Sequence, residues 1–204
     1  MAHLPSSDAA RGRPFEAGHA DLLLDIAERA IVDGLRRLRP TVPTSEELPG
    51  ELRHSSGTFV TLHVHGELNG CIGSIGTDEP VGMSVARHAW AAAFADPRLP
   101  PLRWVDYEHL DVEVSILSPL SPIAAGSREA LVDALEPGVD GLLIAAGTRQ
   151  AVFLPSVWDQ LASPDDFLGH LLRKAGLDPA TWPHDLRAFG FTAEKFARRA
   201  SIER

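Results

Sequence analysis

The stretch GTFVTLHVHGELNGCIG, residues 57–73, decides how this chain folds. Val60, Leu62 and Val64 alternate with less apolar residues, as in a strand that buries one of its faces. Gly66 marks a turn, and the sequence returns through residues 68–72. The stretch therefore predicts a β-hairpin with one aliphatic face and one more polar face.

The register of this hairpin decides which face carries Cys71. A loop of about three residues, at 65–67, would create these pairs: Val64 with Leu68, Leu62 with Gly70, and Val60 with Ile72. The opposite face would then carry Phe59, Thr61, His63, Asn69 and Cys71. A loop of two residues would mix aliphatic and polar side chains on both faces. We favour the longer loop because it gathers the aliphatic side chains for burial, although Gly66 suits the last loop position better than the middle one.

Helices and further strands are predicted on both sides of the hairpin. Apolar residues at helical spacing, with prolines, glycines and capping residues at the ends, indicate helices near 19–39, 77–95, 128–135 and 163–175. Alternating or continuous apolar residues indicate strands near 110–116, 138–146, 151–154 and 186–196. Because these elements follow one another without regular βαβ spacing, the sequence predicts an α+β fold, with mixed or antiparallel sheets and flanking helices.

The chain of 204 residues suits one domain, or one domain with a smaller lobe. Residues 1–18 are rich in Ala, Ser, Arg, Gly and Pro and show little apolar periodicity, so we expect a disordered tail there. The remainder, residues 19–204, is expected to form one domain module.

Composition and charge exclude several classes of protein. A formal net charge of −9 argues against nonspecific binding to nucleic acid, which needs clusters of Lys and Arg. No segment approaches the roughly 20 consecutive apolar residues of a membrane span, so no membrane partner is expected. The chain has one cysteine, Cys71, and cannot form an internal disulfide. These features, and the lack of an apolar run near residue 1, predict a cytoplasmic protein.

Three residues are candidates for catalysis. Cys71 is the candidate nucleophile, and in the favoured register it shares a face with His63, which could act as a base. Glu113 lies on the less apolar face of its strand and could orient a neighbouring group. Each also has a structural interpretation, since a free cysteine is often a small buried residue and Glu113 could lie on an ordinary surface.

Five residues are candidates for ligand binding: Asn69, Gly70, Gly73, Asp96 and Arg98. Gly70 and Gly73 would let a ligand approach the main chain closely. Asn69 would hydrogen-bond to the ligand. The segment 96–98, Asp-Pro-Arg, could contact the ligand too, although a turn with a local ion pair is the simpler interpretation.

His63, His65 and Cys71 could in principle ligate a metal, since residues two apart share one face of a strand. We nevertheless predict no tightly bound metal and no cofactor, because these ligands would come from one exposed hairpin with no further groups to orient the imidazoles. The sequence also lacks the phosphate-binding loop, the nucleophile elbow and the His-Glu-x-x-His helix of familiar enzyme classes.

Eight segments, taken in order, resemble the AMMECR family, the A-component of the AmmeMemoRadiSam system. They are GTFVTL (57–62), GELNGCIG (66–73), AWAAAF (89–94), DPRLPPL (96–102), VEVSILS (112–118), VFLPSV (152–157), FL (167–168) and KAGL (174–177). The resemblance implies a two-lobed α+β fold, with the strand of Cys71 near the cleft between the lobes. It also implies a functional link to a Memo-type protein, similar to non-haem iron dioxygenases, and to a radical S-adenosylmethionine protein.

The chain departs from the family pattern at three positions. The family's hallmark reads Leu-Arg-Gly-Cys-Ile-Gly, and this chain has Asn69 where the Arg stands. An amide cannot replace the bidentate anion contact of a guanidinium, which affects any ligand preference carried over from the family. Leu99 also stands where Phe is usual, and Ser156 where Gln is usual. The family pattern does not require histidine at positions 63 and 65.

Two functional hypotheses follow from these residues. In the first, the Gly-Cys-Ile-Gly strand forms a cleft site that binds or acts on a small molecule or a modified residue, with Cys71 as its thiol. In the second, the protein is a non-catalytic adaptor and Cys71 is a packed core residue. The sequence shows no complete catalytic constellation, and this keeps the second hypothesis open.

Overall fold

The structure is a computed structural model, and it describes residues 17–37, 39–124, 126–161 and 163–201. The described residues divide into two compact units. The larger unit contains the described residues up to Leu117 and those from Glu194 onward, and the smaller unit contains Ser118–Ala193. The described part of the chain therefore passes from the larger unit into the smaller one after Leu117 and returns at Glu194.

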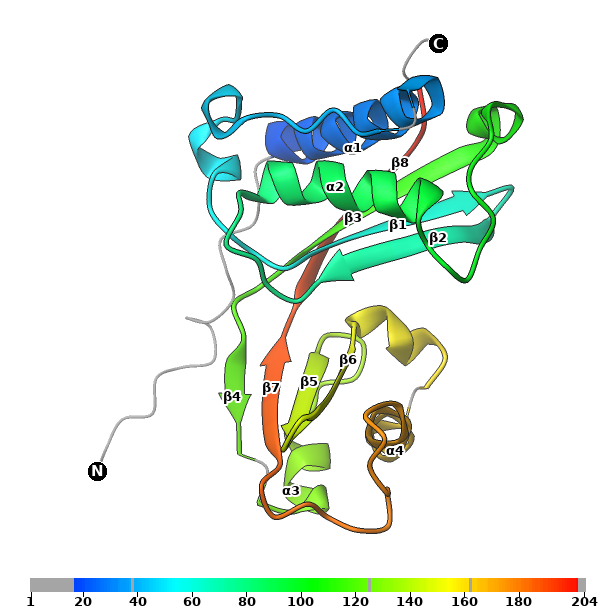
Figure 1. Cartoon of the computed structure of the whole chain (residues 1–204). Coiled ribbons are helices and arrows are strands. Elements are labelled where there is room, and N and C mark those ends of the chain that lie inside the picture. The colour runs from blue at the N-terminus through cyan, green and yellow to red at the C-terminus, as the bar shows by residue number, and fades with distance from the viewer. Residues whose placement is uncertain (1–16, 38, 125, 162, 202–204) are drawn as a thin grey trace. The chain divides into compact units, whose positions relative to one another are not determined.

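The larger unit is a four-stranded sheet with two helices on one of its faces (Figure 1). The strands lie in the order β2-β1-β3-β8, and β1 is antiparallel to both of its neighbours. Their bounds are β1 (Thr58–Val64), β2 (Glu67–Ser74), β3 (Leu110–Leu117) and β8 (Ala193–Arg199). The helices are α1 (Ala17–Arg37) and α2 (Val81–Phe94), and short 3-10 helices occupy Ser45–Glu47, Gly50–Leu52 and Trp104–His109.

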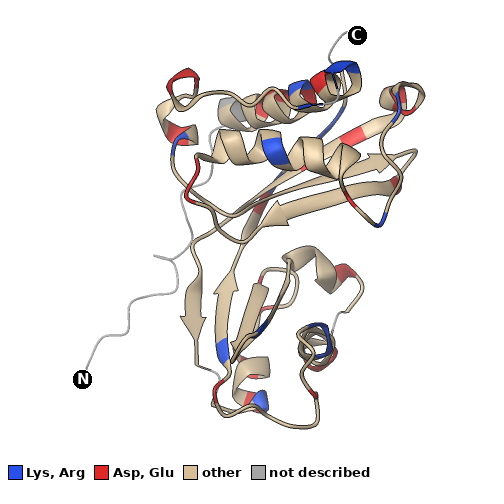
Figure 2. Ribbon diagram, viewed as in Figure 1, with Lys and Arg blue, Asp and Glu red and all other residues tan. Residues whose placement is uncertain are grey.

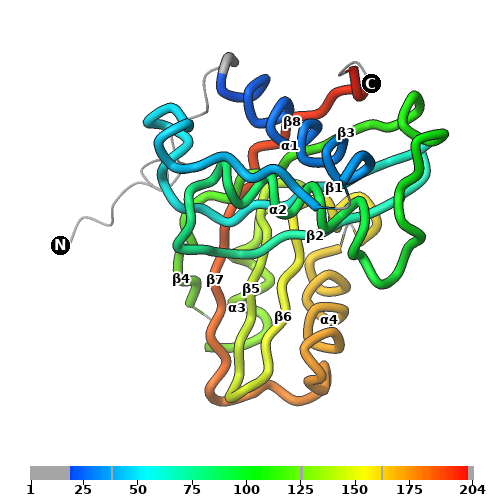
Figure 3. Tube along the Cα trace, turned by 45° about the horizontal axis from the view of Figure 1, so that its top comes forward, coloured from blue at the N-terminus to red at the C-terminus, as the bar shows by residue number. Residues whose placement is uncertain are grey.

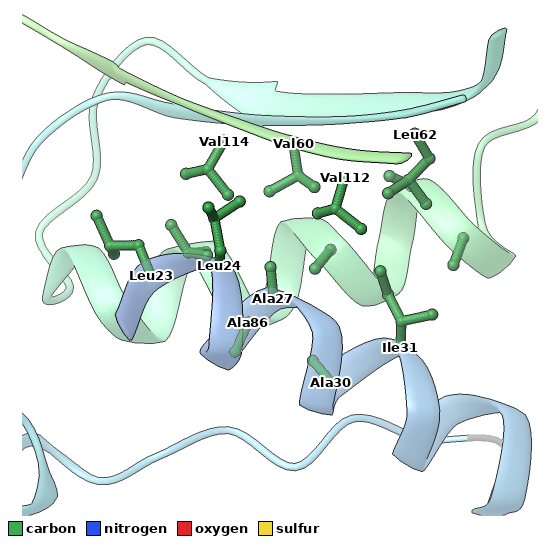
Figure 4. Close-up of a cluster of buried hydrophobic side chains, with 14 of the residues drawn as sticks. Leu23, Leu24, Ala27, Ala30, Ile31, Val60, Leu62, Ala86, Val112 and Val114 are labelled. Carbon is green, nitrogen blue, oxygen red and sulfur yellow. The ribbon is translucent and has the colours of Figure 1, made fainter. Parts of the chain in front are cut away.

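The core of the larger unit lies between this sheet and the two helices. Val60, Leu62 and Val114 project from the sheet and are fully buried. Figure 4 shows these side chains opposite Leu23 and Ile31 of α1, with small alanines of both helices between them. The alternation that predicted a half-buried strand at 58–64 thus corresponds to a sheet covered by helices on its aliphatic face.

A buried carboxylate joins distant parts of the larger unit. Glu28 of α1 is fully buried. It accepts hydrogen bonds from Tyr107 Oη at 2.5 Å, from Arg198 Nη2 at 2.9 Å and from the main-chain N–H of Ser201 at 2.5 Å. Arg198 also pairs with Asp25. This cluster fastens α1 to the 3-10 helix at 104–109 and to the end of β8.

The smaller unit has its own antiparallel sheet, in the order β4-β7-β5-β6 (Figure 3). Its elements are β4 (Ser121–Ile123), α3 (Arg128–Asp133), β5 (Gly141–Ala146), β6 (Arg149–Phe153), a 3-10 helix at Pro155–Asp159, α4 (Pro164–Lys174) and β7 (Arg187–Phe191). Trp158 stacks on Phe167 in its core, with 3.9 Å between the ring centroids. As the sequence predicted, Ser163 caps α4 by accepting a hydrogen bond from the N–H of Asp166.

Three sequence-based boundaries were wrong. The segment 186–196 forms two strands rather than one, β7 in one sheet and β8 in the other. We expected Pro119 and Pro122 to end the strand near 110–116, but Pro122 lies inside β4, an edge strand, where proline is tolerated. Helix α2 begins at Val81, so residues 77–80 precede it.

The predicted tail is only partly covered by the structure. Residues 1–16 of it lie outside the described residues, so their predicted disorder stays a prediction. Ala17 and Gly18 belong to α1, so the described helix overlaps the last two residues of the predicted tail.

The predicted three-residue loop of the hairpin was also wrong. The turn is formed by His65 and Gly66 alone, with φ of 55° and 83°, and Val64 pairs with Glu67. A two-residue hairpin turn with two positive φ angles matches the natural twist of the strands. A bulge then shifts the register, so that His63 pairs with Leu68 while Leu62 still pairs with Gly70. The bulge therefore restores two of the predicted pairs, Leu62 with Gly70 and Val60 with Ile72, while the predicted pair of Val64 with Leu68 was wrong and Leu68 is exposed.

Charged residues of both signs are interspersed in both units (Figure 2). Among the residues that the structure describes, no helix is long and apolar enough to cross a membrane.

Candidate functional site

The face of the larger sheet opposite its helices carries a row of polar groups. Val60 and Leu62 point into the core, so the alternate residues of β1 project from the opposite face. Thr61 pairs with Cys71 of β2 on one side and with Glu113 of β3 on the other. The register thus places a thiol, a hydroxyl and a carboxylate side by side across three strands.

The groups of this row are partly connected by hydrogen bonds and charge. Thr61 Oγ1 donates a hydrogen bond to Cys71 Sγ at 3.4 Å. The Cys71 residue is half-buried, so its thiol lies at a surface rather than deep in the core. Glu113 lies 3.9 Å from the ammonium group of Lys195, on β8. The row therefore continues across the whole sheet, from thiol to ammonium.

His63 lies on the same face as Cys71 but at a different level along the sheet. It pairs with Leu68 of β2 and with Asp111 of β3. No hydrogen bond joins His63 to Cys71 among the described residues. The imidazole is therefore a neighbour on the face, and its predicted role as a base for Cys71 stays a prediction.

The three candidate metal ligands are not brought together. His65 occupies the hairpin turn, where its ring lies against that of His109 with 4.0 Å between the centroids. His63 and Cys71 lie on the strands. Within the described ranges, no three His, Cys, Asp or Glu side chains form a group that could hold a metal ion.

Asp96 is buried and binds the main chain of Cys71. Its Oδ2 accepts a hydrogen bond from the Cys71 N–H at 3.0 Å. It also accepts from Arg98, at the main-chain N–H (3.1 Å), Nε (2.9 Å) and Nη2 (2.7 Å). The hydrogen bond from the Arg98 side chain is the main cause that holds the pKa of Asp96 far below its usual range, followed by the Cys71 N–H, against the opposing effect of burial.

Arg98 completes this connection from the other side. Its Nη2 donates to the carbonyl oxygen of Cys71 at 3.0 Å, while 61% of the side chain stays exposed. The pKa of Arg98 is raised, chiefly by its hydrogen bond to Asp96 and further by the charge of Asp96 and by the Cys71 side chain, with burial opposing. Asp96 and Arg98 thus bind the main chain of Cys71, one at its N–H and the other at its C=O.

The two flanking glycines are explained by packing. A Cβ atom at Gly70 would lie 1.9 Å from the carbonyl oxygen of Ala92 in α2. A Cβ atom at Gly73 would lie 2.3 Å from the ring of Phe59. Gly70 therefore allows the helix to approach the strand, and Gly73 makes room for an aromatic ring on the polar face. Their predicted roles in ligand access find no separate support in this geometry.

Asn69, which stands where the hallmark has Arg, lies in the bulge of β2. The register steps from Gly70 to Leu68, so Asn69 has no partner on β1. Its Oδ1 is buried and accepts no hydrogen bond within the described residues. An acceptor in this state can take a hydrogen bond from a water or from a ligand.

A second polar cluster lies on the helix side of the sheet, and the sequence did not reveal it. Thr58 Oγ1 lies 2.8 Å from Nδ1 of His88 and 3.2 Å from Oγ of Ser84. Thr58 and Ser84 are fully buried. Ser84 and His88 are four residues apart in α2, which places them on one face of the helix. The spacing of four residues was the signal present in the sequence. It indicates a polar cluster only once α2 is known to pack against β1.

We predict a pH-dependent stability from His88. Burial is the main cause that lowers its pKa from 6.5, with the charge of Glu79 partly opposing. As the pH falls below about 6.5, the unfolded chain binds a proton at this residue before the folded protein does. The free energy of unfolding should therefore decrease between pH 7.5 and 5.5. Denaturant unfolding at both values should show a smaller decrease in His88→Gln than in the wild type, and an unchanged decrease in the exposed control His170→Gln.

Comparison with known proteins identifies the family. The model of the family described as AMMECR1 matches residues 24–196. The chain belongs to the AMMECR1 family. The matched range includes the whole row of Cys71, Thr61 and Glu113, as well as Asp96 and Arg98.

The relatives of this AMMECR1-family chain include several archaeal proteins. It is 33% identical to a protein of Methanothermobacter thermautotrophicus over 189 residues, covering 90% of this chain and 96% of the relative. It is 35% identical to a protein of Thermococcus kodakarensis over 187 residues, covering 86% and 88%. A crystal structure of an uncharacterized protein from Pyrococcus horikoshii matches with a TM-score of 0.82 and 31% identity, over 90% of this chain and 93% of that one. The family and the α+β fold expected from the sequence are thereby confirmed.

Proposed function

We propose that this AMMECR1-family protein uses the polar face around Cys71 to bind or modify a small molecule or a modified residue of another protein. The observation that carries the proposal is the hydrogen bond from Thr61 Oγ1 to Cys71 Sγ, in a row that also contains Glu113. Cys71 is the reacting or contacting thiol. Thr61 orients the sulfur, and Glu113 lies next in the row as an acceptor for a ligand proton.

The surroundings of the thiol support this assignment over that of an inert core cysteine. The residue is half-buried, whereas inert structural cysteines are typically buried in apolar surroundings. A hydroxyl donor lies at its sulfur, and the guanidinium of Arg98 binds the carbonyl oxygen of the same residue. Two residues away, the buried Oδ1 of Asn69 accepts no hydrogen bond within the described residues.

The proposal includes partners that the family resemblance implies. A Memo-type protein and a radical S-adenosylmethionine protein would supply or consume the molecule that meets Cys71. Chemistry beyond thiol reactivity would then belong to those partners. Co-purification of the three proteins from one cell extract would test this link, and Cys71→Ser should leave such a complex intact.

The proposed role of Thr61 is testable by alkylation. Since Cys71 is the only cysteine, iodoacetamide modifies a single thiol and intact-protein mass spectrometry gives the rate directly. Thr61→Val removes the hydroxyl donor and should slow alkylation at pH 7 by about 2- to 10-fold, the value of one modest hydrogen bond. Thr61→Ser keeps the donor and should restore a rate close to that of the wild type. Equal rates in wild type and Thr61→Val would contradict the row as a functional unit.

A non-catalytic adaptor is the second candidate, and the glycines favour it. Packing alone accounts for Gly70 and Gly73, so the Gly-Cys-Ile-Gly pattern can be interpreted as structural. An adaptor would need Cys71 only for packing. Cys71→Ser separates the two candidates. If Cys71 is a functional thiol, the Cys71→Ser variant should keep its stability and its partners but lose its cellular activity. If the protein is an adaptor, a stable Cys71→Ser variant should keep its activity.

A further inference from the structure

Strand β2, which carries Cys71, forms one edge of the larger sheet. It has β1 on one side and no strand on the other among the described residues. An edge strand presents main-chain N–H and C=O groups to which another strand can pair, and natural proteins protect such edges. Any groups that protect this edge must therefore lie next to the main chain of β2, beside Cys71.

The main chain of Cys71 faces this open edge. In an antiparallel pair, residues alternate between those bonded to the neighbouring strand and those whose N–H and C=O point away from it. The Cys71 N–H donates to Asp96, and its C=O accepts from Arg98. Both groups therefore point outward, and Cys71 forms a pair with Thr61 of the type without mutual hydrogen bonds.

Asp96 and Arg98 occupy the positions that a further strand would use. The carboxylate accepts as a carbonyl oxygen would, and the guanidinium donates as an N–H would. The two groups are fixed by three hydrogen bonds from Arg98 to Asp96, and the Asp96 side chain is only 2% exposed. Since their charges compensate each other, the pair is poorly suited to attract an anionic ligand. Its geometry fits the strand edge better.

We infer that Asp96 and Arg98 form a cap that closes the edge of β2 against pairing with a second copy of this chain. The next residue with outward-facing groups is Gly73, two positions further along. Its main chain carries no comparable cap within the part of the chain that the structure describes. Removal of the cap would thus leave a continuous open edge from Cys71 to Gly73. This inference concerns the main chain and does not depend on a reactive Cys71 thiol.

The geometry of such pairing predicts a specific product. Two β2 strands that pair antiparallel about Cys71 place the two Cys71 residues directly opposite each other. Hydrogen-bonded opposite residues have Cα atoms about 5.5 Å apart, within the range of about 4.4–6.8 Å that a disulfide spans. The two thiols would therefore give two protons and two electrons to an oxidant such as diamide, which becomes the hydrazine, and form one intermolecular disulfide.

The experiment compares the wild type with Asp96→Ala/Arg98→Ala. The oligomeric mass is measured by light scattering after size exclusion, and cross-linking by diamide is followed on non-reducing gels. The variant should gain a dimer peak and should form the Cys71 disulfide at least about tenfold faster than the wild type, because pairing raises the local thiol concentration. Arg103→Ala/Asp106→Ala removes an exposed ion pair from a 3-10 helix and should behave as the wild type.

The outcomes separate clearly. A folded double variant that remains at the wild-type mass and cross-links at the wild-type rate overturns the inference. A wild type that already cross-links at the rate of the variant overturns it as well, since the edge would not be closed. If the double variant fails to fold, Arg98→Gln is used instead, because it changes an exposed side chain and keeps the Asp96 carboxylate on the Cys71 N–H, while removing the guanidinium bonds to Asp96 and to the Cys71 carbonyl. A smaller rise in cross-linking is expected there, and a wild-type rate in that folded variant overturns the inference.

Discussion

Replacing Glu28 with alanine should lower the free energy of unfolding by about 3 kcal/mol, since buried hydrogen-bond donors then lose their shared acceptor and Arg198 keeps only the exposed Asp25. The carboxylate is fully buried and satisfies Tyr107 Oη, Arg198 Nη2 and the N–H of Ser201. Its loss removes the acceptor that these donors share, of which Arg198 keeps Asp25, and creates a cavity between α1 and the end of β8. Each of these effects destabilises the folded state.

Chemical denaturation of wild type, Glu28→Ala and Asp25→Ala would measure this effect. Asp25 also pairs with Arg198, but 42% of its side chain is exposed. Its removal should cost about 1 kcal/mol or less, as for other exposed ion pairs. Glu28→Gln keeps the volume and should lie between the two. If Glu28→Ala cost no more than Asp25→Ala, the buried cluster would not hold the C-terminal segment in place.

Gly70→Ala should destabilise the protein by a similar amount, about 3 kcal/mol, because the added methyl group meets rigid main chain. Its Cβ would lie 1.9 Å from the oxygen and 2.7 Å from the carbonyl carbon of Ala92. Relief requires either the strand or α2 to move. A flexible side chain could yield more cheaply than this main chain.

Thermal or denaturant unfolding of Gly70→Ala can be compared with Gly50→Ala. A Cβ atom at Gly50 would have no other atom within 4 Å, and the φ of this residue is not in the left-handed region. The control should therefore change the free energy of unfolding by no more than about 0.5 kcal/mol. A stable Gly70→Ala protein would mean that the glycine is not needed for packing, and Gly70 would again be a candidate for ligand contact.

Much of the larger unit follows from local sequence. The alternation of Val60, Leu62 and Val64 predicted the aliphatic face, and the core contains it. The turn at 65–66 was misjudged because positive φ at a histidine is uncommon, although Gly66 in the last loop position was the signal for it. The bulge beside it could not be predicted, since it compensates for a loop length that had itself been misjudged.

The long-range features could not be predicted in the same way. The sequence of residues 186–196 indicates one continuous strand, but the chain passes from one sheet to the other at Thr192. The residues before and after Thr192 have similar strand propensity, so the sequence does not show where the chain changes sheet. Asp96 and Arg98 were recognised as a local ion pair, whereas their bonds to Cys71, 25 and 27 residues away, depend on where the loop after α2 returns.

In the candidate site, too, the local features could be predicted and the long-range ones could not. Cys71, Thr61 and Glu113 could be placed on strands from the sequence, and the pairing of Cys71 with Thr61 followed from the favoured register. That these residues form one row could not be predicted without the order of the strands, since Glu113 lies on β3. The cluster of Thr58 and His88 was missed for the same reason, because a strand and a helix contribute to it.

The most direct test of the proposed function is the rate at which iodoacetamide alkylates Cys71 at pH 7. The rate is measured in the folded protein, in the same protein in denaturant, and for a free cysteine peptide in each buffer as a reference. A working thiol supported by Thr61 and Arg98 should react about 3- to 10-fold faster in the folded protein than its reference. Slow alkylation of the folded protein that rises to the reference rate only on unfolding would contradict the proposal and identify Cys71 as a structural residue.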